Sequence, residues 1–261
     1  MPRYLIDCEL AGAGFAGTQV QAGARTVQGE LMRVAAQLND GVATAVRPAS
    51  RLDSGVDAQH LPCDLQLERE WPLRGLVHAF TKALPGDLCV RRAARVDDGF
   101  HAIHRAVSKT YRYAVVVRGA RPARDLGRWW VCRPLDPARL HAAAALLPGA
   151  RDLGAFACLR HDGSDDDDPV RTIHHAGWTD ARTDHDPAWI FRITGSGFLY
   201  RQVRALVGAM VHTAGPYGDP AAFAAAVAGG RGHPRPGDVA PAAGLCLEQV
   251  RYDPEPEWTW A

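Results

Sequence analysis

Hydrophobic and polar positions along the chain follow the two short periods that predict strands and helices. Apolar residues at positions 4, 6, 8 and 10 alternate with polar ones, which predicts a half-buried strand near the start. After Thr26, which can cap a helix, apolar residues over 27–38 recur with helical spacing. The same reasoning predicts strands over 61–67, 88–96, 110–117, 172–179, 189–194 and 245–252, and helices over 73–84, 137–147, 199–213 and 220–229.

The order of these elements favours an α+β fold over a doubly wound parallel sheet. Strands and helices alternate irregularly and include hairpin-like pairs. The order strand, helix, strand, helix, strand occurs once before about residue 104, and a similar set follows it with different lengths. We therefore predict two α/β-sandwich lobes with antiparallel sheets, residues 1–104 and residues 105–261, which meet at one central cleft.

Composition argues against a membrane protein or an exported one. The chain has 261 residues, 47% of them hydrophobic, and no apolar run approaches the roughly 18 residues that a membrane helix needs. Asp7 stands where a signal peptide would be apolar. The six cysteines are scattered and form no CxxC pair, which predicts reduced and mostly buried thiols in a cytoplasmic protein.

Positive charge is concentrated in one part of the chain. The formal net charge is only +1, yet residues 91–128 hold ten Lys and Arg against three acidic residues. We call these ten cations the basic stripe. Such a stripe fits a surface that binds the phosphate backbone of a nucleic acid, and it fits an ordinary solvated ribbon equally well.

Motifs for metal and nucleotide cofactors are missing from the sequence. The 11 histidines form no HExxH motif and no set with cysteine at tetrahedral zinc spacing. Gly12-Ala13-Gly14 is not followed by the pattern of a dinucleotide-binding helix, and there is no P-loop or GxSxG. We therefore expect no metal and no cofactor.

Three local features are candidates for chemistry. Read alone, "SRLDSGVDA" (50–58) is a turn that contains the carboxylate of Asp53. Tyr111 and Tyr113 share one face of a strand, where Tyr113 fits core packing and Tyr111 fits either the core or a stack on a base. Gly208, inside a helix, costs up to about 1 kcal/mol relative to alanine, so we expect another segment to pack closely there.

Five segments occur in an order that is typical of one family. "RTVQGEL" (25–31) matches that family's first helix, and "SRLDSGVDA" looks like its catalytic motif. "FHAIHRAVSKTYRYAV" (100–115), "GSGFLYRQVRALVG" (195–208) and "AAGLCLEQVRY" (242–252) follow in the same order. Together they span nearly the whole chain and resemble the tRNA pseudouridine synthase A (TruA) family.

This resemblance implies an isomerase that needs no cofactor or metal. It would break the N-glycosidic bond of a uridine in the anticodon stem-loop of tRNA, rotate the uracil and rejoin it through carbon. Asp53 would be the catalytic carboxylate, which either attacks the nucleotide or withdraws a sugar proton. Tyr111 would stack on the uracil and is a candidate acceptor of its C5 proton, and Arg204 would pair with Asp53.

The resemblance also implies residues that bind the substrate. Arg51 would hold the nucleotide flipped out of the RNA stack, and Leu245 would line the uracil pocket. Arg105, Arg201 and Gln202 are further candidates for substrate binding. The family fold would be a pseudouridine-synthase core of two ferredoxin-like (RRM-like) lobes, and the expected assembly is a homodimer that shares one tRNA.

The chain departs from the family pattern at positions that would grip the substrate. Leu52, Asp57, Thr18 and Ile103 stand where the family has other residue types. Two alternatives therefore stay open at this point. One is a diverged enzyme that acts on another RNA or on a free uridine nucleotide, and the other is a non-catalytic RNA-binding protein.

Overall fold

The computed structural model describes residues 1–123, 127–159, 168–182 and 188–260. The chain divides into two compact units: Met1–Lys109 together with Cys246–Ala261, and Thr110–Leu245. The prediction drew the boundary at residue 104 and left the last strand in the second lobe. The end of the chain groups with the first unit because the last long strand pairs with a strand of that unit.

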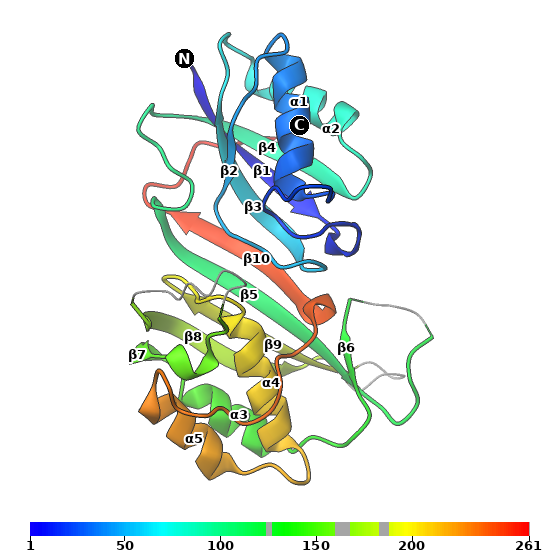
Figure 1. The fold of residues 1–261 in the computed structure, drawn as a ribbon, viewed down its shortest axis with the longest axis vertical. Coiled ribbons are helices and arrows are strands. Elements are labelled where there is room, and N and C mark those ends of the chain that lie inside the picture. The colour runs from blue at the N-terminus through cyan, green and yellow to red at the C-terminus, as the bar shows by residue number, and fades with distance from the viewer. Residues whose placement is uncertain (124–126, 160–167, 183–187, 261) are drawn as a thin grey trace. The chain divides into compact units, whose positions relative to one another are not determined.

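The first unit is built on a mostly antiparallel sheet with the order β11-β4-β1-β3-β10, and β2 pairs with β3 (Figure 1). The pairing of β10 with β3 is parallel, whereas the prediction had only antiparallel sheets. The strands are β1 (Arg3–Leu10), β2 (Val46–Pro48), β3 (Asp57–Gln66), β4 (Leu88–Val96), β10 (Leu245–Tyr252, whose first residue belongs to the second unit) and β11 (Thr259–Trp260).

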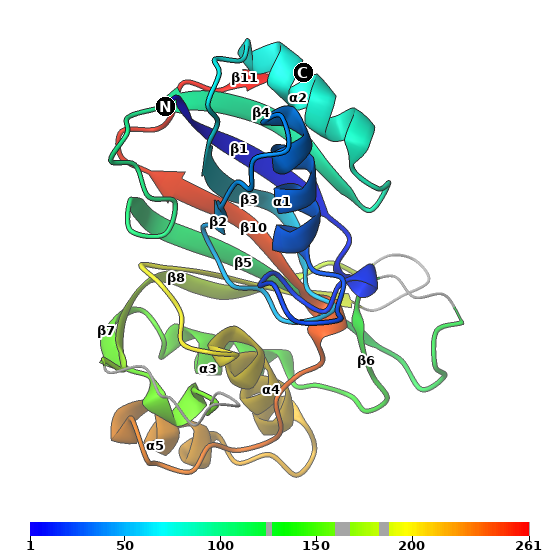
Figure 2. The ribbon, with the colours of Figure 1, turned by 45° about the horizontal axis from the view of Figure 1, so that its top comes forward.

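Two helices cover one face of this sheet, α1 (Val27–Leu38) and α2 (Leu73–Ala83) (Figures 1 and 2). The predicted cap of α1 is confirmed, because Thr26 Oγ1 accepts a hydrogen bond from Gly29 N at 3.2 Å. Apolar residues at helical spacing turn inward on both helices, so the periodicity in the sequence located them correctly.

The second unit pairs four strands in the order β5-β9-β8-β7, and β6 lies parallel to β5. Its three helices pack against one another and against this sheet (Figure 2). The strands are β5 (Ala106–Val117, which enters this unit at residue 110), β6 (Trp129–Val131), β7 (Gly149–Asp152), β8 (Val170–Asp180) and β9 (Ala188–Gly195). The helices are α3 (Pro137–Ala145), α4 (Gln202–Ala214) and α5 (Pro220–Gly229).

Helix α4 begins three residues later than predicted. The apolar pattern placed its start at Leu199, but Arg201 has φ 57° and so lies in the left-handed region. A residue in that conformation cannot continue a right-handed helix, so the chain turns once before α4 begins. Leu199 is still buried, which is why the pattern included it.

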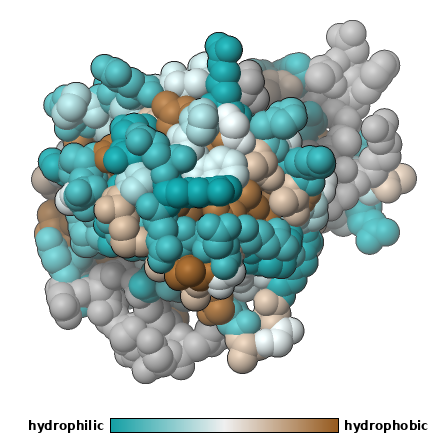
Figure 3. All heavy atoms as spheres, turned by 90° about the horizontal axis from the view of Figure 1, so that it is seen from above, coloured by the Kyte–Doolittle hydropathy of each residue, from teal (hydrophilic) through white to brown (hydrophobic). Residues whose placement is uncertain are grey.

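The described part of the chain contains no helix long and apolar enough to cross a membrane. The face seen in Figure 3 carries mainly hydrophilic residues. All six cysteines are free thiols, and three of them (Cys8, Cys63 and Cys246) are buried. A side-chain hydrogen bond to Cys63 and burial together raise the pKa of the Cys8 thiol well above its usual value.

Candidate functional site

The loop that carries Asp53 is held by a second loop of the first unit. Thr18 N donates to the carbonyl of Leu52 at 3.1 Å, and Leu52 N donates to Thr18 Oγ1 at 2.7 Å. Ser54 Oγ donates to the carbonyl of Phe15 at 3.0 Å. The residues on both sides of Asp53 are therefore fixed to the loop of residues 11–23, and Asp53 itself is half-buried.

Close backbone approach between these two loops requires glycine. A Cβ on Gly12 would overlap the carbonyl of Val56, and a Cβ on Gly17 (φ 106°) would lie 2.8 Å from the carbonyl of Leu52. Asp57 Oδ1 accepts from Gly12 N at 2.8 Å. The two departures Thr18 and Asp57 thus serve the same end, which is to anchor the loop around Asp53.

Lys109, one of the ten cations of the basic stripe, binds the segment that leads to Asp53. Its Nζ donates to the carbonyl of Ala49, four residues before Asp53, at 2.7 Å. Burial lowers the pKa of Lys109 to about 8. In the sequence, Lys109 directly precedes the predicted strand 110–117, and nothing in that pattern indicates its bond to Ala49.

Tyr111 lies on β5 in the second unit and is 6% exposed. Its ring meets the ring of Phe198 edge to face, with centroids 5.2 Å apart and planes at 87°. Phe198 belongs to the glycine-rich segment before α4, so α4 and β5 are joined through this aromatic pair. Leu245, the residue expected to line the uracil pocket, is 7% exposed.

Arg204 lies in the first turn of α4, and its Nε donates to the carbonyl of Ala240 at 2.8 Å. One turn later, Gly208 lies against residues 238–240, so the predicted close approach at this glycine is confirmed. The sequence could not indicate which segment packs there. Tyr113, predicted as core, is fully buried and also donates from its hydroxyl to the carbonyl of Pro241 at 2.7 Å.

Arg201 and Gln202 form the turn into α4. The guanidinium of Arg201 lies 4.9 Å from the centre of the Tyr200 ring. Gln202 is fully buried, and its amide accepts from Leu199 N at 3.0 Å and donates to the carbonyl of Leu153 at 3.4 Å. These two bonds give Gln202 a role in shaping the turn.

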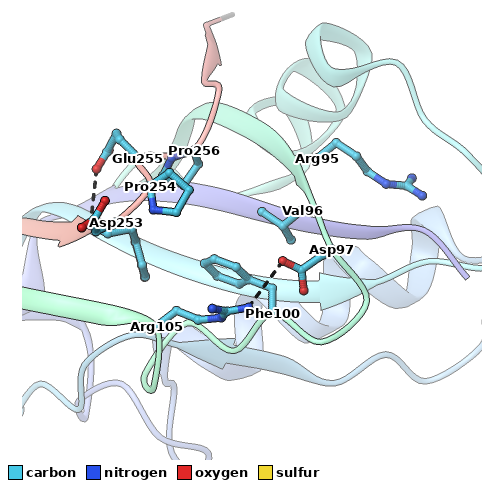
Figure 4. A pocket seen from close by; sticks show the side chains of 10 residues that line it. Arg95, Val96, Asp97, Phe100, Arg105, Asp253, Pro254, Glu255 and Pro256 are labelled. Atoms are coloured by element: carbon cyan, nitrogen blue, oxygen red, sulfur yellow. Dashed lines mark hydrogen bonds and ion pairs between the residues drawn. The ribbon is translucent and has the colours of Figure 1, made fainter.

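Arg105 lies at a surface pocket of about 220 Å³ in the first unit (Figure 4). It forms an ion pair with Asp97 at 3.8 Å, and the two side chains are 56% and 63% exposed. The ring of Phe100 lies beside this pair, and Pro254 lies across the pocket (Figure 4). Arg51 is exposed on the loop that carries Asp53.

The basic stripe is partly neutralised by acidic residues of its own unit. Arg92 Nε lies 2.8 Å from a carboxylate oxygen of the buried Asp7. Three further arginines of the stripe also form ion pairs, as Arg91 does with Glu9, Arg95 with Glu70, and Arg105 with Asp97. Position 124 of the stripe and the acid at position 125 lie outside the described residues. The stripe is therefore less cationic at its first half than the sequence suggests.

Among the residues that the structure describes, no group of three or more His, Cys, Asp or Glu side chains could hold a metal ion. The predicted site residues are divided between the two units. Arg51, Asp53 and Arg105 belong to the first, and Tyr111, Arg201, Gln202, Arg204 and Leu245 belong to the second.

Comparison with known proteins gives a consistent set of relatives. The sequence model of a family described as "tRNA pseudouridine synthase" matches residues 143–253. The chain is 38% identical over 260 residues to "tRNA pseudouridine synthase A" of Methylobacterium sp. (strain 4-46), covering 98% of this chain and 99% of that one. It is 34% identical over 256 residues to the protein of that name from Mesorhizobium japonicum, covering 97% of this chain and 100% of that one.

One solved structure, "Crystal structure of the archaeal box H/ACA sRNP Nop10-Cbf5 complex", is 12% identical with a TM-score of 0.34, covering 95% of this chain and 50% of that one. At that TM-score the likeness is too weak to bear on the fold. The sequence relatives are decisive, because their identity extends over nearly the full length of both chains. The chain belongs to the tRNA pseudouridine synthase A family.

Proposed function

We propose that this protein converts uridine to pseudouridine in the anticodon stem-loop of tRNA, with Asp53 as the reacting carboxylate. The observation that supports it best is the loop around Asp53. Its neighbour Leu52 is held by two hydrogen bonds, one to the backbone N–H and one to the hydroxyl of Thr18, and Ala49 accepts from the amine of the half-buried Lys109. A rigid loop would hold the Asp53 carboxylate in the position that reaction with one nucleotide atom requires.

In the proposed reaction the bond between uracil N1 and ribose C1′ breaks, and a bond between C5 and C1′ forms. The proton on C5 is removed, and N1 of the product carries one. Asp53 either attacks the nucleotide or withdraws a sugar proton in the first step, and Tyr111 stacks on the uracil and accepts the C5 proton. Arg204 pairs with the Asp53 carboxylate, which needs a cationic partner once the base excludes water.

The target uridine must leave the RNA stack before this chemistry can occur. Arg51 is exposed next to the Asp53 loop and would take the place of the base in the stack. Leu245 would supply an apolar wall for the uracil. Basic residues of the stripe would contact the RNA backbone, and candidates in its described second half are Arg112, Arg118, Arg121 and Arg128.

The test compares the wild type with Asp53→Ala and Asp53→Asn on unmodified tRNA transcripts, with pseudouridine quantified by mass spectrometry after isomer-specific labelling. We expect the wild type to form pseudouridine and both Asp53 variants to form none. Asp98→Asn, which changes an exposed carboxylate of the same unit, serves as the matched control and should stay active. Product formed at wild-type rate by Asp53→Ala would remove Asp53 from the mechanism.

Two further substrates separate the alternatives that the departures raised. Turnover of free uridine monophosphate or of an unrelated RNA at a rate equal to that of tRNA would contradict tRNA as the substrate. Binding of tRNA without any product at stoichiometric enzyme would indicate a non-catalytic binder. Mapping the modified position in the tRNA tests the anticodon stem-loop assignment.

We also propose that the two units are the ferredoxin-like lobes of the family fold, that the protein forms a homodimer and that it works in the cytoplasm. These proposals rest on family membership. Light scattering coupled to size exclusion gives the mass of the particle in solution, and a monomer at micromolar concentration would contradict the dimer.

A further inference from the structure

A short segment of the second unit, residues 237–241, lies along α4, and we call it the strap. Two hydrogen bonds join it to Arg204. The Nε of Arg204 donates to the carbonyl of Ala240 at 2.8 Å, and Ala240 N donates to the carbonyl of Arg204 at 3.1 Å. Ala240 is 1% exposed, so its amide and carbonyl are almost wholly shielded from water, while Arg204 is half-buried. The strap therefore holds both the backbone and the side chain of Arg204.

Two glycines allow the strap to lie this close to the helix. A Cβ on Gly208, one turn after Arg204 on α4, would overlap the carbonyl of Asp238 and lie 3.0 Å from Ala240 N. Gly237 has φ 71°, and a Cβ there would lie 2.6 Å from His212 Cβ. The strap thus follows α4 for two turns, and it has no space to move toward the helix.

Tyr113 holds the other end of the strap. Its hydroxyl donates to the carbonyl of Pro241 at 2.7 Å, and its side chain is fully buried. Burial raises the pKa of Tyr113 well above its usual value, so the hydroxyl keeps its proton and remains a donor. A Cβ on Gly244 would lie 2.5 Å from Tyr113 Cε1, so the chain after the strap packs directly on this ring.

We infer that Tyr113 is a positioning residue for the reaction, because it fixes the strap and the strap fixes the guanidinium of Arg204. The inference rests on the proposed function, in which Arg204 pairs with the catalytic carboxylate. The Nε–H of Arg204 is committed to Ala240. A carboxylate can therefore approach only through the two terminal NH₂ groups, and the bond to Ala240 sets the plane in which they lie.

The chain offers a matched control for a buried tyrosine. Tyr252 is 3% exposed and donates from its hydroxyl to the carbonyl of Ala102 at 3.0 Å. Its pKa is also raised by burial. Tyr252 belongs to the first unit, whereas Arg204 belongs to the second. Replacing either tyrosine with phenylalanine removes one buried hydroxyl donor and leaves a carbonyl without it, so the effects on stability should be similar.

The first experiment measures kcat and KM for tRNA in Tyr113→Phe and Tyr252→Phe beside the wild type. Tyr113→Phe should lower kcat by about tenfold and leave KM within about twofold, because a misdirected guanidinium weakens the chemical step more than RNA binding. Tyr252→Phe should leave both constants within about twofold. Equal kcat values for the two variants would overturn the inference.

A second measurement needs no activity. The Nε–H resonance of Arg204, assigned by its loss in Arg204→Lys, should be protected from solvent exchange in the wild type and in Tyr252→Phe, and should lose protection in Tyr113→Phe. Unchanged protection in Tyr113→Phe would contradict the link from Tyr113 to Arg204. A wild type that makes no pseudouridine would overturn the proposed function, and the resonance would still decide whether Tyr113 orders Arg204.

A glycine pair tests the strap from the helix side. Gly208→Ala pushes the strap away from α4, whereas Gly75→Ala in α2 places a Cβ whose nearest neighbour is 3.9 Å away. Gly208→Ala should show the same two effects as Tyr113→Phe, a lower kcat and a faster solvent exchange of the Arg204 Nε–H. Gly75→Ala should change neither. A folded Gly208→Ala protein with wild-type kcat would show that the reaction does not need the strap.

Discussion

Thr18 and Leu52 are joined in both directions, since Thr18 N donates to the Leu52 carbonyl at 3.1 Å and Leu52 N donates to Thr18 Oγ1 at 2.7 Å. Thr18 is 1% exposed and Leu52 is 7% exposed. Leu52, the residue next to Asp53, is therefore fixed by two buried hydrogen bonds. In one of them the acceptor is the side-chain hydroxyl of Thr18.

Thr18→Val keeps the shape of the side chain and removes this acceptor. We expect a loss of about 1–3 kcal/mol in the free energy of unfolding, because Leu52 N is left buried without its partner. We also expect a lower kcat, because the Asp53 loop is loosened. Urea unfolding and turnover of tRNA measure the two effects.

Thr213→Val is the control for that change. Thr213 is 1% exposed, and within the described residues its Oγ1 has no hydrogen-bond partner. Its replacement by valine should be neutral or stabilising. A Thr18→Val protein as stable and active as Thr213→Val would contradict the role given to Thr18.

Asp57 should act as an acceptor for Gly12 N rather than through its charge. Asp57→Asn keeps an oxygen in this place, so we expect stability and activity close to those of the wild type. Asp57→Ala leaves Gly12 N without the acceptor and should lose about 1–3 kcal/mol of stability. Parallel unfolding curves of the two variants decide this, and equal losses would show that the negative charge matters.

Lys109 should make the stability of the protein depend on pH. Its pKa is about 8 in the folded protein and 10.5 in its usual state. Below pH 8 the lysine is charged in both states, and the folded protein bears the cost of burying that charge. Between pH 8 and 10.5 the unfolded chain binds more protons, so stability rises with pH and the cost disappears above that range.

The free energy of unfolding of the wild type should therefore rise with pH relative to that of Lys109→Met, by about 3 kcal/mol at most across this range. Lys82→Met, which changes an exposed lysine on α2, should show no such dependence. A flat difference for Lys109→Met would mean that the amine is better solvated than its surroundings indicate.

Arg105 should contribute little to stability. Its ion pair with Asp97 joins two exposed side chains at 3.8 Å, and such pairs contribute at most about 1 kcal/mol. If Arg105 contacts the RNA backbone, Arg105→Ala raises KM for tRNA and lowers the salt dependence of binding by about one charge, with kcat unchanged. An unchanged KM and salt slope would exclude Arg105 from the RNA surface.

Local patterns in the sequence located most elements because their causes are local. The cap at Thr26 and the apolar spacing after it predicted α1, and the aromatic and β-branched run after residue 110 predicted β5. The start of α4 was wrong by three residues, since a left-handed backbone at Arg201 leaves no trace in the hydrophobic pattern. The short strands β2, β6, β7 and β11 were not anticipated, because they are made by pairing with distant strands.

The candidate site shows the same division. The order of motifs singled out Asp53, Tyr111 and Arg204, and the glycine at 208 predicted a close approach. The roles of Thr18, Asp57, Lys109 and Tyr113 could not be predicted, because each lies in a bond to a backbone group far away in the chain.

By itself, the amino-acid sequence determined the helices, the long strands and the family, because caps, periodicity and motif order are properties of neighbouring residues. Only the tertiary structure decided that β10 pairs with β3, that the Asp53 loop is braced by residues 11–23, and that the strap holds Arg204. The physical reason is that a backbone carbonyl or amide is present at every position. Which of them a side chain reaches depends on how the chain folds back on itself.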